Sequence, residues 1–349
     1  MRDMRVAIVG YGLAGRFFHA PLIAATDGLE VSSIVTSNAA RSGEASVEHP
    51  GAQVVASVED LWAAASPELV VVATANTSHL PIASAVIEHG APVVVEKPAA
   101  LTAAEAKALV DQADQAEVML TVFQNRRWDT DQLTLRRLVE EDALGEVVRY
   151  ESRFERWRPR LDPTKPRENL PPEEGGGVLL DLGVHLVDQA MALFGSATEV
   201  YAEIDARRGA PAEDDVFVAL RHASGTISHL HASAVTPSIG PRLRVQGTAG
   251  GFLVPNLDPQ EAALRAGARP DTVEEWGKPG EWEYGRLIAG ERSVPVPPEP
   301  GNWPRFYALL RDALRDGGPP PVDPRDAVET LRVLEAARRA ARERRIVAL

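Results

Sequence analysis

The chain contains no cysteine, which excludes disulfide bonds and metal sites built on thiolates and fits a cytoplasmic protein. It has no run of about 18 apolar residues, so we expect no membrane-spanning helix. An apolar stretch at residues 6–9 follows closely on the first methionine, so we expect no secretory signal peptide. These absences favour a globular protein of the cytoplasm.

Positive charge is also scarce. The formal net charge is −13 over 349 residues, which argues against nucleic acid as a partner because phosphate binding requires clustered cations. The arginine-rich stretch at residues 338–345 is a local exception, which we expect to be the exposed face and basic end of a last helix. The length favours two domains.

The first 122 residues alternate short apolar strands with amphipathic helices, a pattern that predicts a doubly wound parallel sheet. Ser57 and Thr102 each stand three residues before an acid, the spacing of a helix cap, and Gly90 is suited to end the helix that begins near Ser78. The expected strands are residues 5–9, 30–35, 69–73, 92–95 and 118–122.

After about residue 125 the pattern changes to strands with one polar face, joined by turns, which implies a mainly antiparallel sheet. We therefore predict an α/β protein with two domains, residues 1–124 and an α+β domain of residues 125–349, and an active site in the cleft between them. The expected strands are residues 146–156, 199–207, 215–221, 226–234 and 242–246. The expected helices are residues 130–141, 181–194, 303–315 and 324–344.

A glycine-rich turn directly follows the first predicted strand. Gly10, Gly12 and Gly15, with Leu13 and Ala14 between them, form a GxGxxG motif that opens a helix. Such glycines allow a tight turn and let the backbone approach a pyrophosphate at the helix N-terminus. The first domain is therefore predicted to bind a dinucleotide.

An NAD enzyme usually carries an acid at the end of the second strand, where it binds the ribose hydroxyls. This chain has no acid there. Thr36 and Ser37 stand there instead, with Arg41 shortly after. Hydroxyls beside an arginine suit the 2′-phosphate of NADP, so NADP is favoured over NAD. The alternative is that Arg41 points into water and that either cofactor is accepted.

Polar residues also follow the strand at residues 69–73. Thr74, Asn76 and His79 stand at the carboxyl edge of the sheet, where they could contact the ribose or the nicotinamide. The alternative is that Ser78 only caps a helix and that His79 is a residue of its first turn.

Lys97 stands in an unusual position, because the buried run at residues 93–95 ends abruptly in Glu96, Lys97 and Pro98. Ligands of open α/β sheets bind outside the carboxyl ends of the strands, so Lys97 is predicted to project into the cleft. The alternative is a solvated lysine at the start of a loop.

Asp181 and His185 follow three glycines at residues 175–177 and are four residues apart, so they share one helix face. Alone, they could be a first-turn acid and a packed core histidine. With Lys97 they suit the oxidation of an alcohol, in which Lys97 polarises the oxygen and His185 takes the proton.

These motifs together resemble the family of glucose-fructose oxidoreductase, inositol dehydrogenase and MocA, here called the Gfo/Idh/MocA family. The resemblance rests on the glycine turn, Glu96-Lys97-Pro98 and the GGG-x3-DxGxH segment, and it covers nearly the whole chain. Residues 12–23, 125–129 and 156–159 look most like the NADP-dependent scyllo-inositol dehydrogenase branch. The resemblance implies a Rossmann domain and an open, mainly antiparallel sheet that often pairs with a second copy, hence a homodimer or homotetramer.

The family's motifs carry over to particular residues of this chain. Lys97 matches the catalytic lysine, Asp181 the substrate-binding acid and His185 the proton-transfer histidine, and Glu96 accompanies Lys97 at the cofactor. The bond between Lys97 and Pro98 is expected to be cis, as is often the case in the family.

The resemblance further places Asn125, Arg126 and Trp128 at the cleft, near substrate or nicotinamide. Arg156 and Arg158 are expected to bind substrate hydroxyls or a carboxylate, or alternatively to end a solvated strand. The pair Phe123-Gln124 departs from the polar or hydroxyl-bearing residues usual in related enzymes, which leaves the substrate open.

The predicted function is an NADP-dependent oxidoreductase that acts on a cyclic polyol or sugar in either direction. The alternatives are a sugar, aldose or dihydrodiol dehydrogenase, and a regulator that only senses the nucleotide. His229 and His231 share a strand face, but strand alternation explains the pair and no third ligand is near, so no metal is expected.

Overall fold

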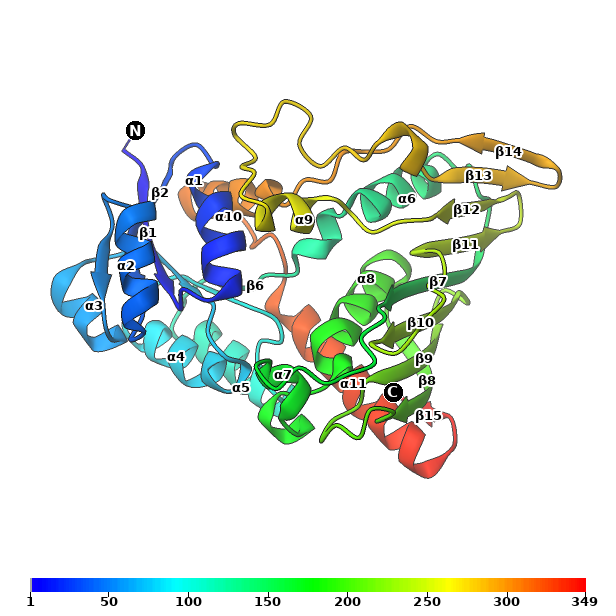
Figure 1. Cartoon of the computed structure of the whole chain (residues 1–349), viewed down its shortest axis with the longest axis horizontal. Helices are drawn as coiled ribbons and strands as arrows, with labels where there is room; N and C mark the ends of the chain where they lie inside the picture. Colours follow the sequence, from blue (N-terminus) through cyan, green and yellow to red (C-terminus); the bar gives the residue numbers. More distant parts are fainter. Residues whose placement is uncertain (1) are drawn as a thin grey trace.

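The computed structural model describes residues 2–349, and its first half is built on six parallel strands in the order β3-β2-β1-β4-β5-β6 (Figure 1). The central strands are covered on both faces, which explains why they are continuous apolar runs. All five predicted strands are present, and β3 at the sheet edge was missed. The strands are β1 (Met4–Val9), β2 (Leu29–Val35), β3 (Gln53–Val55), β4 (Leu69–Val72), β5 (Val93–Val95) and β6 (Leu120–Val122).

The helices of the first half begin and end largely where the local sequence predicts. Ser57 accepts a hydrogen bond from the backbone of Asp60 (3.1 Å), Thr102 forms a full capping box, and Gly90 adopts φ +74° after a helix. The fourth helix begins at Asn76, so Ser78 lies in its first turn and is not its cap. These helices are α2 (Ala39–Glu48), α3 (Val58–Ala64), α4 (Asn76–Glu88) and α5 (Ala103–Gln115).

The second half contains a nine-stranded sheet in the order β14-β13-β12-β11-β7-β10-β9-β8-β15. Only β7 and β10 pair in parallel, so the predicted open, mainly antiparallel sheet is confirmed. The sequence analysis missed the short strands β12 to β15, which form the two ends of the sheet. The strands are β7 (Val147–Glu155), β8 (Ala197–Asp205), β9 (Asp215–His222), β10 (Ile227–Ser233), β11 (Leu243–Gly247), β12 (Gly251–Val254), β13 (Arg286–Ala289), β14 (Arg292–Pro295) and β15 (Val347–Ala348).

The predicted helices of the second half are also present, and one begins differently. Where a regular helix was expected from Asp181, the chain forms a π-helical turn, η4 (Leu179–Gly183), which leads into α8. Such turns are rare and frequent at functional sites. The helices are α6 (Thr130–Glu140), α7 (Pro166–Asn169), α8 (Val184–Phe194), α9 (Gln260–Arg265), α10 (Pro304–Asp316) and α11 (Pro324–Glu343).

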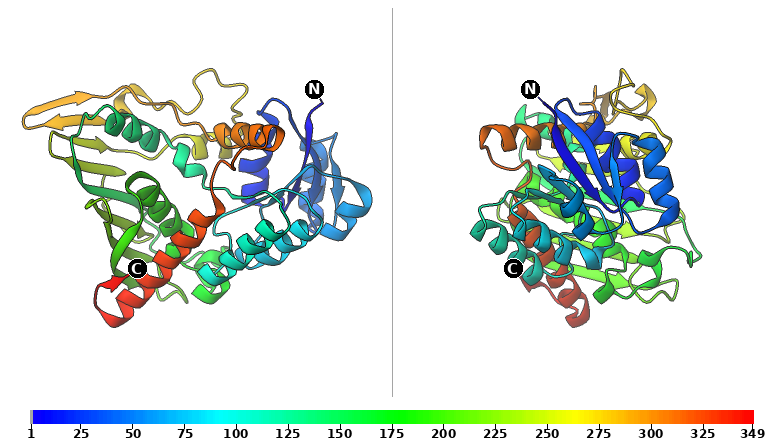
Figure 2. Two further views of the ribbon diagram at one scale, coloured as in Figure 1. Left: turned by 180° about the vertical axis from the view of Figure 1, so that it is seen from behind. Right: turned by 90° about the vertical axis from the view of Figure 1, so that its left-hand side faces the viewer.

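The two closing helices join the halves of the molecule. Helix α10 packs on α1 (Ala20–Ala24) of the first half, where Phe306 and Tyr307 are fully buried. Helix α11 runs between α5 and the nine-stranded sheet, against one face of which α8 also packs (Figure 2). A boundary at residue 124 therefore stays a prediction, because residues from the end of the chain complete the core of the first half.

The sequence analysis made two further predictions about helices: that none spans a membrane, and that the arginine-rich end of the chain is the exposed face of a last helix. In residues 2–349, no helix is long and apolar enough to span a bilayer. The arginines near the end of the chain lie mostly on the exposed face of α11, as predicted, except that Arg338 is partly buried and pairs with Glu213 at 2.7 Å.

Candidate active site

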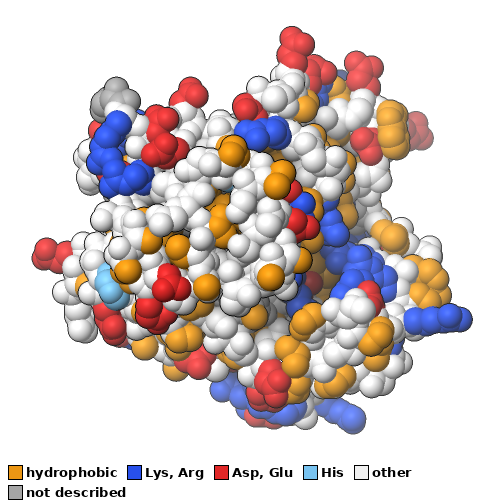
Figure 3. Space-filling view, turned by 60° about the vertical axis from the view of Figure 1, so that its left-hand side comes forward, with side chains coloured by type: hydrophobic (Ala, Val, Ile, Leu, Met, Phe, Trp, Pro, Cys, Tyr) orange, Lys and Arg blue, Asp and Glu red, His pale blue; other side chains and the backbone are white. Residues whose placement is uncertain are grey.

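A cleft of about 410 Å³ lies between the two halves of the molecule, within the size range of small-molecule sites. Basic side chains gather in this hollow (Figure 3). Both halves contribute to its wall, as predicted. The sequence-predicted residues that line it are Leu13, Ala14, Glu96, Lys97, Asn125, Arg126, Arg156, Arg158, Asp181 and His185.

The glycine-rich turn forms one end of the cleft. Gly10 has φ +98°, and a Cβ atom there would lie 2.4 Å from the carbonyl oxygen of Ala73. A Cβ atom on Gly15 would lie 1.9 Å from the carbonyl oxygen of Gly10. By contrast, a Cβ atom on Gly12 would meet nothing closer than the guanidinium of Arg41 at 3.7 Å. The turn is therefore tight where strand and helix meet and open on the side that a ligand would approach.

Arg41 is a free cation at the edge of this turn. Its backbone N–H donates to Oδ1 of Asn38, the residue that caps α2 (3.1 Å), while its exposed side chain forms no ion pair within residues 2–349. Arg16, on the neighbouring helix, is instead held by Glu44 and Glu48. Thr36 and Ser37 stand at the end of β2 as expected, outside the residues that line the cleft.

Thr74, Asn76 and His79 also lie outside the cleft lining. The ring of His79 is buried between two carbonyl oxygens, those of Pro98 (2.7 Å) and Thr74 (3.2 Å), and burial lowers its pKa. The amide of Asn76 donates to the carbonyl oxygen of Gly175 (3.1 Å). The contact of Asn76 ties loops of the two halves together, whereas the contacts of His79 lie within the first half. A role of Thr74, Asn76 and His79 in cofactor binding stays a prediction.

Lys97 is buried at the end of β5, with only 11% of its side chain exposed, so the alternative of a solvated lysine is wrong. Its Nζ donates to the carbonyl oxygen of Asp181 (2.8 Å) and to the carboxylate Oδ1 (3.3 Å). Burial lowers the pKa of Lys97, and the adjacent carboxylate opposes that shift. The peptide bond between Lys97 and Pro98 is cis, as predicted.

Asp181 lies in the π-helical turn η4 and receives a second cation, because Arg167 donates to its Oδ1 (2.5 Å). Burial by itself would raise the pKa of this carboxyl. Arg167, Lys97 and Arg156 outweigh burial and hold the pKa of Asp181 well below its ordinary value. Asp181 is therefore an ionised carboxylate that neutralises and orients Lys97.

His185 stands at the start of α8 and is 5% exposed. Burial, together with the charges of Lys97 and Arg126, lowers its pKa well below the usual range, so the ring is neutral. Among the described residues neither ring nitrogen has a hydrogen-bond partner, and only Nδ1 is enclosed by protein, which leaves Nε2 open to the cleft. Asp181, four residues earlier, accepts hydrogen bonds at its carboxylate from Lys97 and Arg167 and forms none with His185.

Two residues that the sequence analysis missed, His19 and Tyr307, are connected through Glu96 to the backbone of Lys97. His19, from the π-helical turn η1 (Gly15–His19), lies 2.5 Å from the hydroxyl of Tyr307 and 3.1 Å from Glu96 Oε1. Oε2 of Glu96 accepts the backbone N–H of Lys97 (3.0 Å). Burial opposes ionisation of Glu96, but the bond from His19 holds the pKa of this carboxyl below its ordinary value. Nothing local to His19 indicates this chain of contacts, because Tyr307 lies 288 residues away.

Of the three predicted residues that follow β6, two line the cleft and the third packs in the core outside it. Asn125 and Arg126 line the cleft, and Arg126 is paired with Asp129 and with Glu261, a residue the sequence analysis missed. Trp128 does not reach the cleft, contrary to expectation: it packs edge-on against Phe306 (5.9 Å) beside a separate surface pocket. Its bulk completes the core beneath α10.

The histidines of β10 lie on the opposite side of the second half. His229 and His231 both pack against the ring of Phe217 on β9. No group of three or more side chains arranged to hold a metal ion occurs between residues 2 and 349.

Comparison with known proteins places this geometry in context. Residues 4–124 match the oxidoreductase family with an NAD-binding Rossmann fold, and residues 132–253 match the GFO/IDH/MocA C-terminal domain. Scyllo-inositol 2-dehydrogenase (NADP(+)) IolW of Bacillus subtilis is 33% identical, with 99% of this chain and 96% of the relative covered. D-apiose dehydrogenase of Paraburkholderia graminis is 28% identical, with 100% and 90% covered. The solved structure of the oxidoreductase yvaA of Bacillus subtilis superposes with a TM-score of 0.93 at 33% identity, covering 100% of this chain and 99% of that one.

Proposed function

The chain belongs to the Gfo/Idh/MocA family of oxidoreductases, and we propose that it is an NADP-dependent enzyme that transfers a hydride between the nicotinamide and a cyclic polyol or sugar. The observation that carries the proposal is the largely buried ion pair of Lys97 and Asp181 beside a neutral His185 whose Nε2 faces the cleft. The same residues serve oxidation of an alcohol and reduction of a ketone.

The glycine turn fits a dinucleotide. Gly12 leaves its outer side open, whereas Gly10 and Gly15 close the turn against the strand and helix. The unpaired guanidinium of Arg41 beside Gly12 suits the 2′-phosphate that distinguishes NADP from NAD. When bound, the nicotinamide supplies the acceptor or donor of the hydride. The name of the Bacillus subtilis relative, which specifies NADP(+), supports the same preference.

The chain's own residues handle the oxygen and the proton. Lys97 uses two of its three N–H groups on Asp181, and the third is free to donate to the reacting oxygen of the substrate. During oxidation, neutral His185 accepts the hydroxyl proton at Nε2, and during reduction it returns that proton. Glu96, held by His19, fixes the backbone from which Lys97 extends.

We further propose that two copies of the chain pair through the outer face of the nine-stranded sheet. Strands β9 and β10 alternate between buried and half-buried residues, and the half-buried set includes Phe217, His229 and His231. Light scattering of the purified protein tests this pairing, and a monomer at micromolar concentration would contradict it.

The test of the main proposal is a substrate screen with both cofactors. Cyclic polyols, aldoses and diols are offered with NADP⁺ and with NAD⁺, and the appearance of reduced nicotinamide is followed. The proposal expects turnover of at least one cyclic polyol or sugar, faster with NADP⁺. Turnover confined to an aldose would favour a sugar dehydrogenase, as the D-apiose relative suggests. Tight binding of NADPH without turnover of any compound would favour a regulator that senses the nucleotide.

A further inference from the structure

Two arginines follow β7 and point into the cleft from the second half of the molecule. The backbone N–H of Arg156 donates to the carbonyl oxygen of Ser233 (2.8 Å), and that of Arg158 to Ala234 (2.7 Å). The segment therefore stays extended, and residues two apart on an extended chain face the same side. Trp157, between them, bridges to Val235 and is 54% exposed. Strand geometry thus brings Arg156 and Arg158 together at the cleft.

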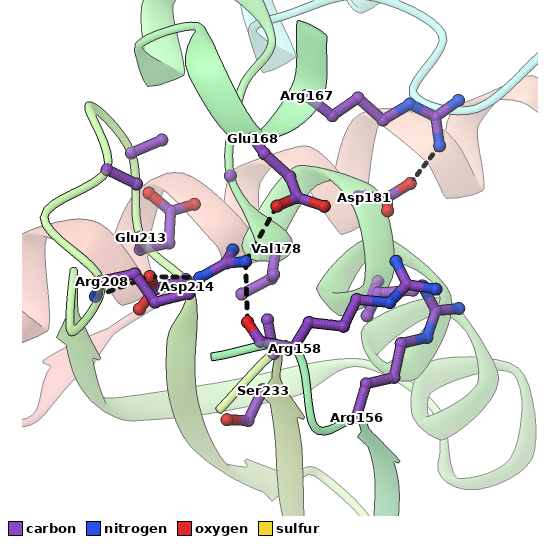
Figure 4. A pocket seen from close by; sticks show the side chains of 15 residues that line it. Arg156, Arg158, Arg167, Glu168, Val178, Asp181, Arg208, Glu213, Asp214 and Ser233 are labelled. Atoms are coloured by element: carbon purple, nitrogen blue, oxygen red, sulfur yellow. Dashed lines mark hydrogen bonds and ion pairs between the residues drawn. The ribbon is translucent and has the colours of Figure 1, made fainter. Parts of the chain in front are cut away.

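Within the described part of the chain, neither guanidinium group has a partner. Their guanidinium ends lie next to each other and are directed toward Asp181 (Figure 4). The dashed line at Arg158 joins its backbone carbonyl oxygen to Arg208 and does not involve its guanidinium group. Throughout residues 2–349, neither side chain forms an ion pair or a hydrogen bond. Arg167 and Arg208, which line the same small pocket, are both paired with carboxylates.

The acids of the cleft are already paired with other side chains. Seven lysines and arginines line the cleft against four acids, in a chain whose net charge is −13. Each of these acids has a partner: Asp181 with Lys97 and Arg167, Glu261 with Arg126 and Arg265, Glu168 with Arg208 and Lys165, and Glu96 with His19.

The charge of Arg156 is unfavourable in its position unless an anionic ligand binds beside it. The side chain is half-buried, and its pKa is lowered first by burial and then by the neighbouring charge of Arg158, which outweigh the attraction of Asp181. Two adjacent guanidinium groups repel each other, and a carboxylate or phosphate placed between them turns that repulsion into two sets of charge-assisted hydrogen bonds.

We propose that the substrate carries an acidic group, a carboxylate or a phosphate, in addition to the hydroxyl that reacts, and that Arg156 and Arg158 bind this group. The inference rests on the proposed function, because it names the class of polyol or sugar that the enzyme accepts. Since the arginines point toward Asp181 and Asp181 holds Lys97, one small molecule contacts the arginine pair and Lys97 at once.

The phosphates of the cofactor are the competing occupants of such a site. The open glycine turn and Arg41 belong to the first half of the molecule. Arg156 and Arg158 belong to the second half, beside Asp181. We therefore assign the arginine pair to the substrate, and the experiment includes cofactor binding as a separate measurement.

The experiment measures binding of three matched probes to the NADP⁺-saturated protein by calorimetry: D-glucose, D-glucuronate and D-glucose 6-phosphate. One acidic probe is expected to bind about tenfold or more tightly than D-glucose, the ratio of a single charge-assisted interaction, and added salt should reduce this advantage. Whichever of the two binds better identifies the acidic group. R156Q and R158Q should each abolish the advantage. R160Q is the matched control, because Arg160 is an exposed residue of the same segment outside the cleft lining.

Specific results would overturn the inference. Equal binding of all three probes would do so, as would R156Q and R158Q variants that weaken NADP⁺ itself and leave the sugar preference intact. Because Arg158 is exposed, R158Q preserves the test even if R156Q fails to fold. Turnover of neutral polyols without any preference for acids would refute only the inference. Tight arginine-dependent binding of an acidic probe, without turnover of any compound, would support the inference while contradicting the proposed function.

Discussion

Lys97 and Asp181 join the two halves of the molecule across the cleft. The lysine extends from the end of β5, and the aspartate stands in the π-helical turn before α8, with 2.8 Å between Nζ and the carbonyl oxygen of Asp181. Burial favours a neutral lysine, and the ionised Asp181 favours a charged one. Burial is the larger effect, so the pKa of Lys97 is lowered on balance, and the Asp181 carboxylate limits that shift. A hydrogen bond from Nζ to a substrate oxygen acts strongly at a place that water barely reaches.

Replacing Lys97 with methionine should lower kcat by about 100- to 10,000-fold, because the reacting oxygen loses its hydrogen-bond donor. Cofactor affinity, followed by NADPH fluorescence, should change little. Lys107→Met is the matched control, since Lys107 is an exposed residue of α5 that pairs only with Asp111. Turnover of Lys97→Met within a few-fold of the unmodified enzyme would sink the catalytic assignment.

Replacing Arg41 with alanine should weaken NADPH by about 10- to 100-fold, because one charge-assisted contact with the 2′-phosphate is lost. NADH, which has no such phosphate, serves as the internal control and should bind as before. The measurement is the dissociation constant of NADPH and of NADH for the unmodified protein and for the Arg41→Ala variant. Equal losses for NADPH and NADH would refute the phosphate contact.

The pH dependence of oxidation should report the neutral state of His185. A free histidine titrates near about 6.5, whereas burial and the charge of Lys97 lower the pKa of His185 well below that value. The base form is therefore present throughout the ordinary histidine range. We expect kcat/KM for the alcohol to stay level as the pH falls through 6.5, and to decline only at more acidic pH. An acid limb at or above the ordinary value would contradict this state of the ring.

Replacing Tyr307 with phenylalanine should lower the free energy of unfolding by about 1–2 kcal/mol, because Nδ1 of buried His19 loses its partner. Denaturant unfolding measures the loss. Tyr201→Phe is the control, since its hydroxyl bonds to Glu203 at the surface of β8, and a change within about 0.5 kcal/mol is expected there. Equal effects of the two substitutions would mean that the contact with His19 contributes no more to the free energy of unfolding than a surface hydrogen bond does.

Replacing Gly15 with alanine should destabilise the protein by about 2 kcal/mol or more and impair cofactor binding, because the new Cβ atom would lie 1.9 Å from the carbonyl oxygen of Gly10. Gly43→Ala is the matched control: it lies inside α2 with nothing within 4 Å of the added atom. That substitution should be neutral or stabilising by up to about 1 kcal/mol. A Gly15→Ala protein as stable as Gly43→Ala would show that the turn is not as tight as described.

Much of the fold could be predicted because its signals are local. Val93 to Val95 are apolar on both faces, which identifies a central parallel strand wherever it lies in the chain. Ser57 and Thr102 mark helix starts by hydrogen bonds that span only three residues. The missed strands β3 and β12 to β15 are short and lie at or near the ends of their sheets, where the apolar pattern weakens because one side of the strand faces water.

The sequence by itself determined the two-part architecture, the glycine turn and the membership of Lys97, Asp181 and His185 in one site, because strand periodicity, caps and short motifs depend on neighbours along the chain. Only the tertiary structure decided how the site works. It paired Asp181 with Lys97 rather than with His185, connected Tyr307 to Glu96 through His19, and packed Trp128 outside the cleft. It also left the guanidinium groups of Arg156 and Arg158 side by side, with no ion pair to either among the described residues. Charge pairing and burial depend on which distant residues meet, and the chain order does not state that.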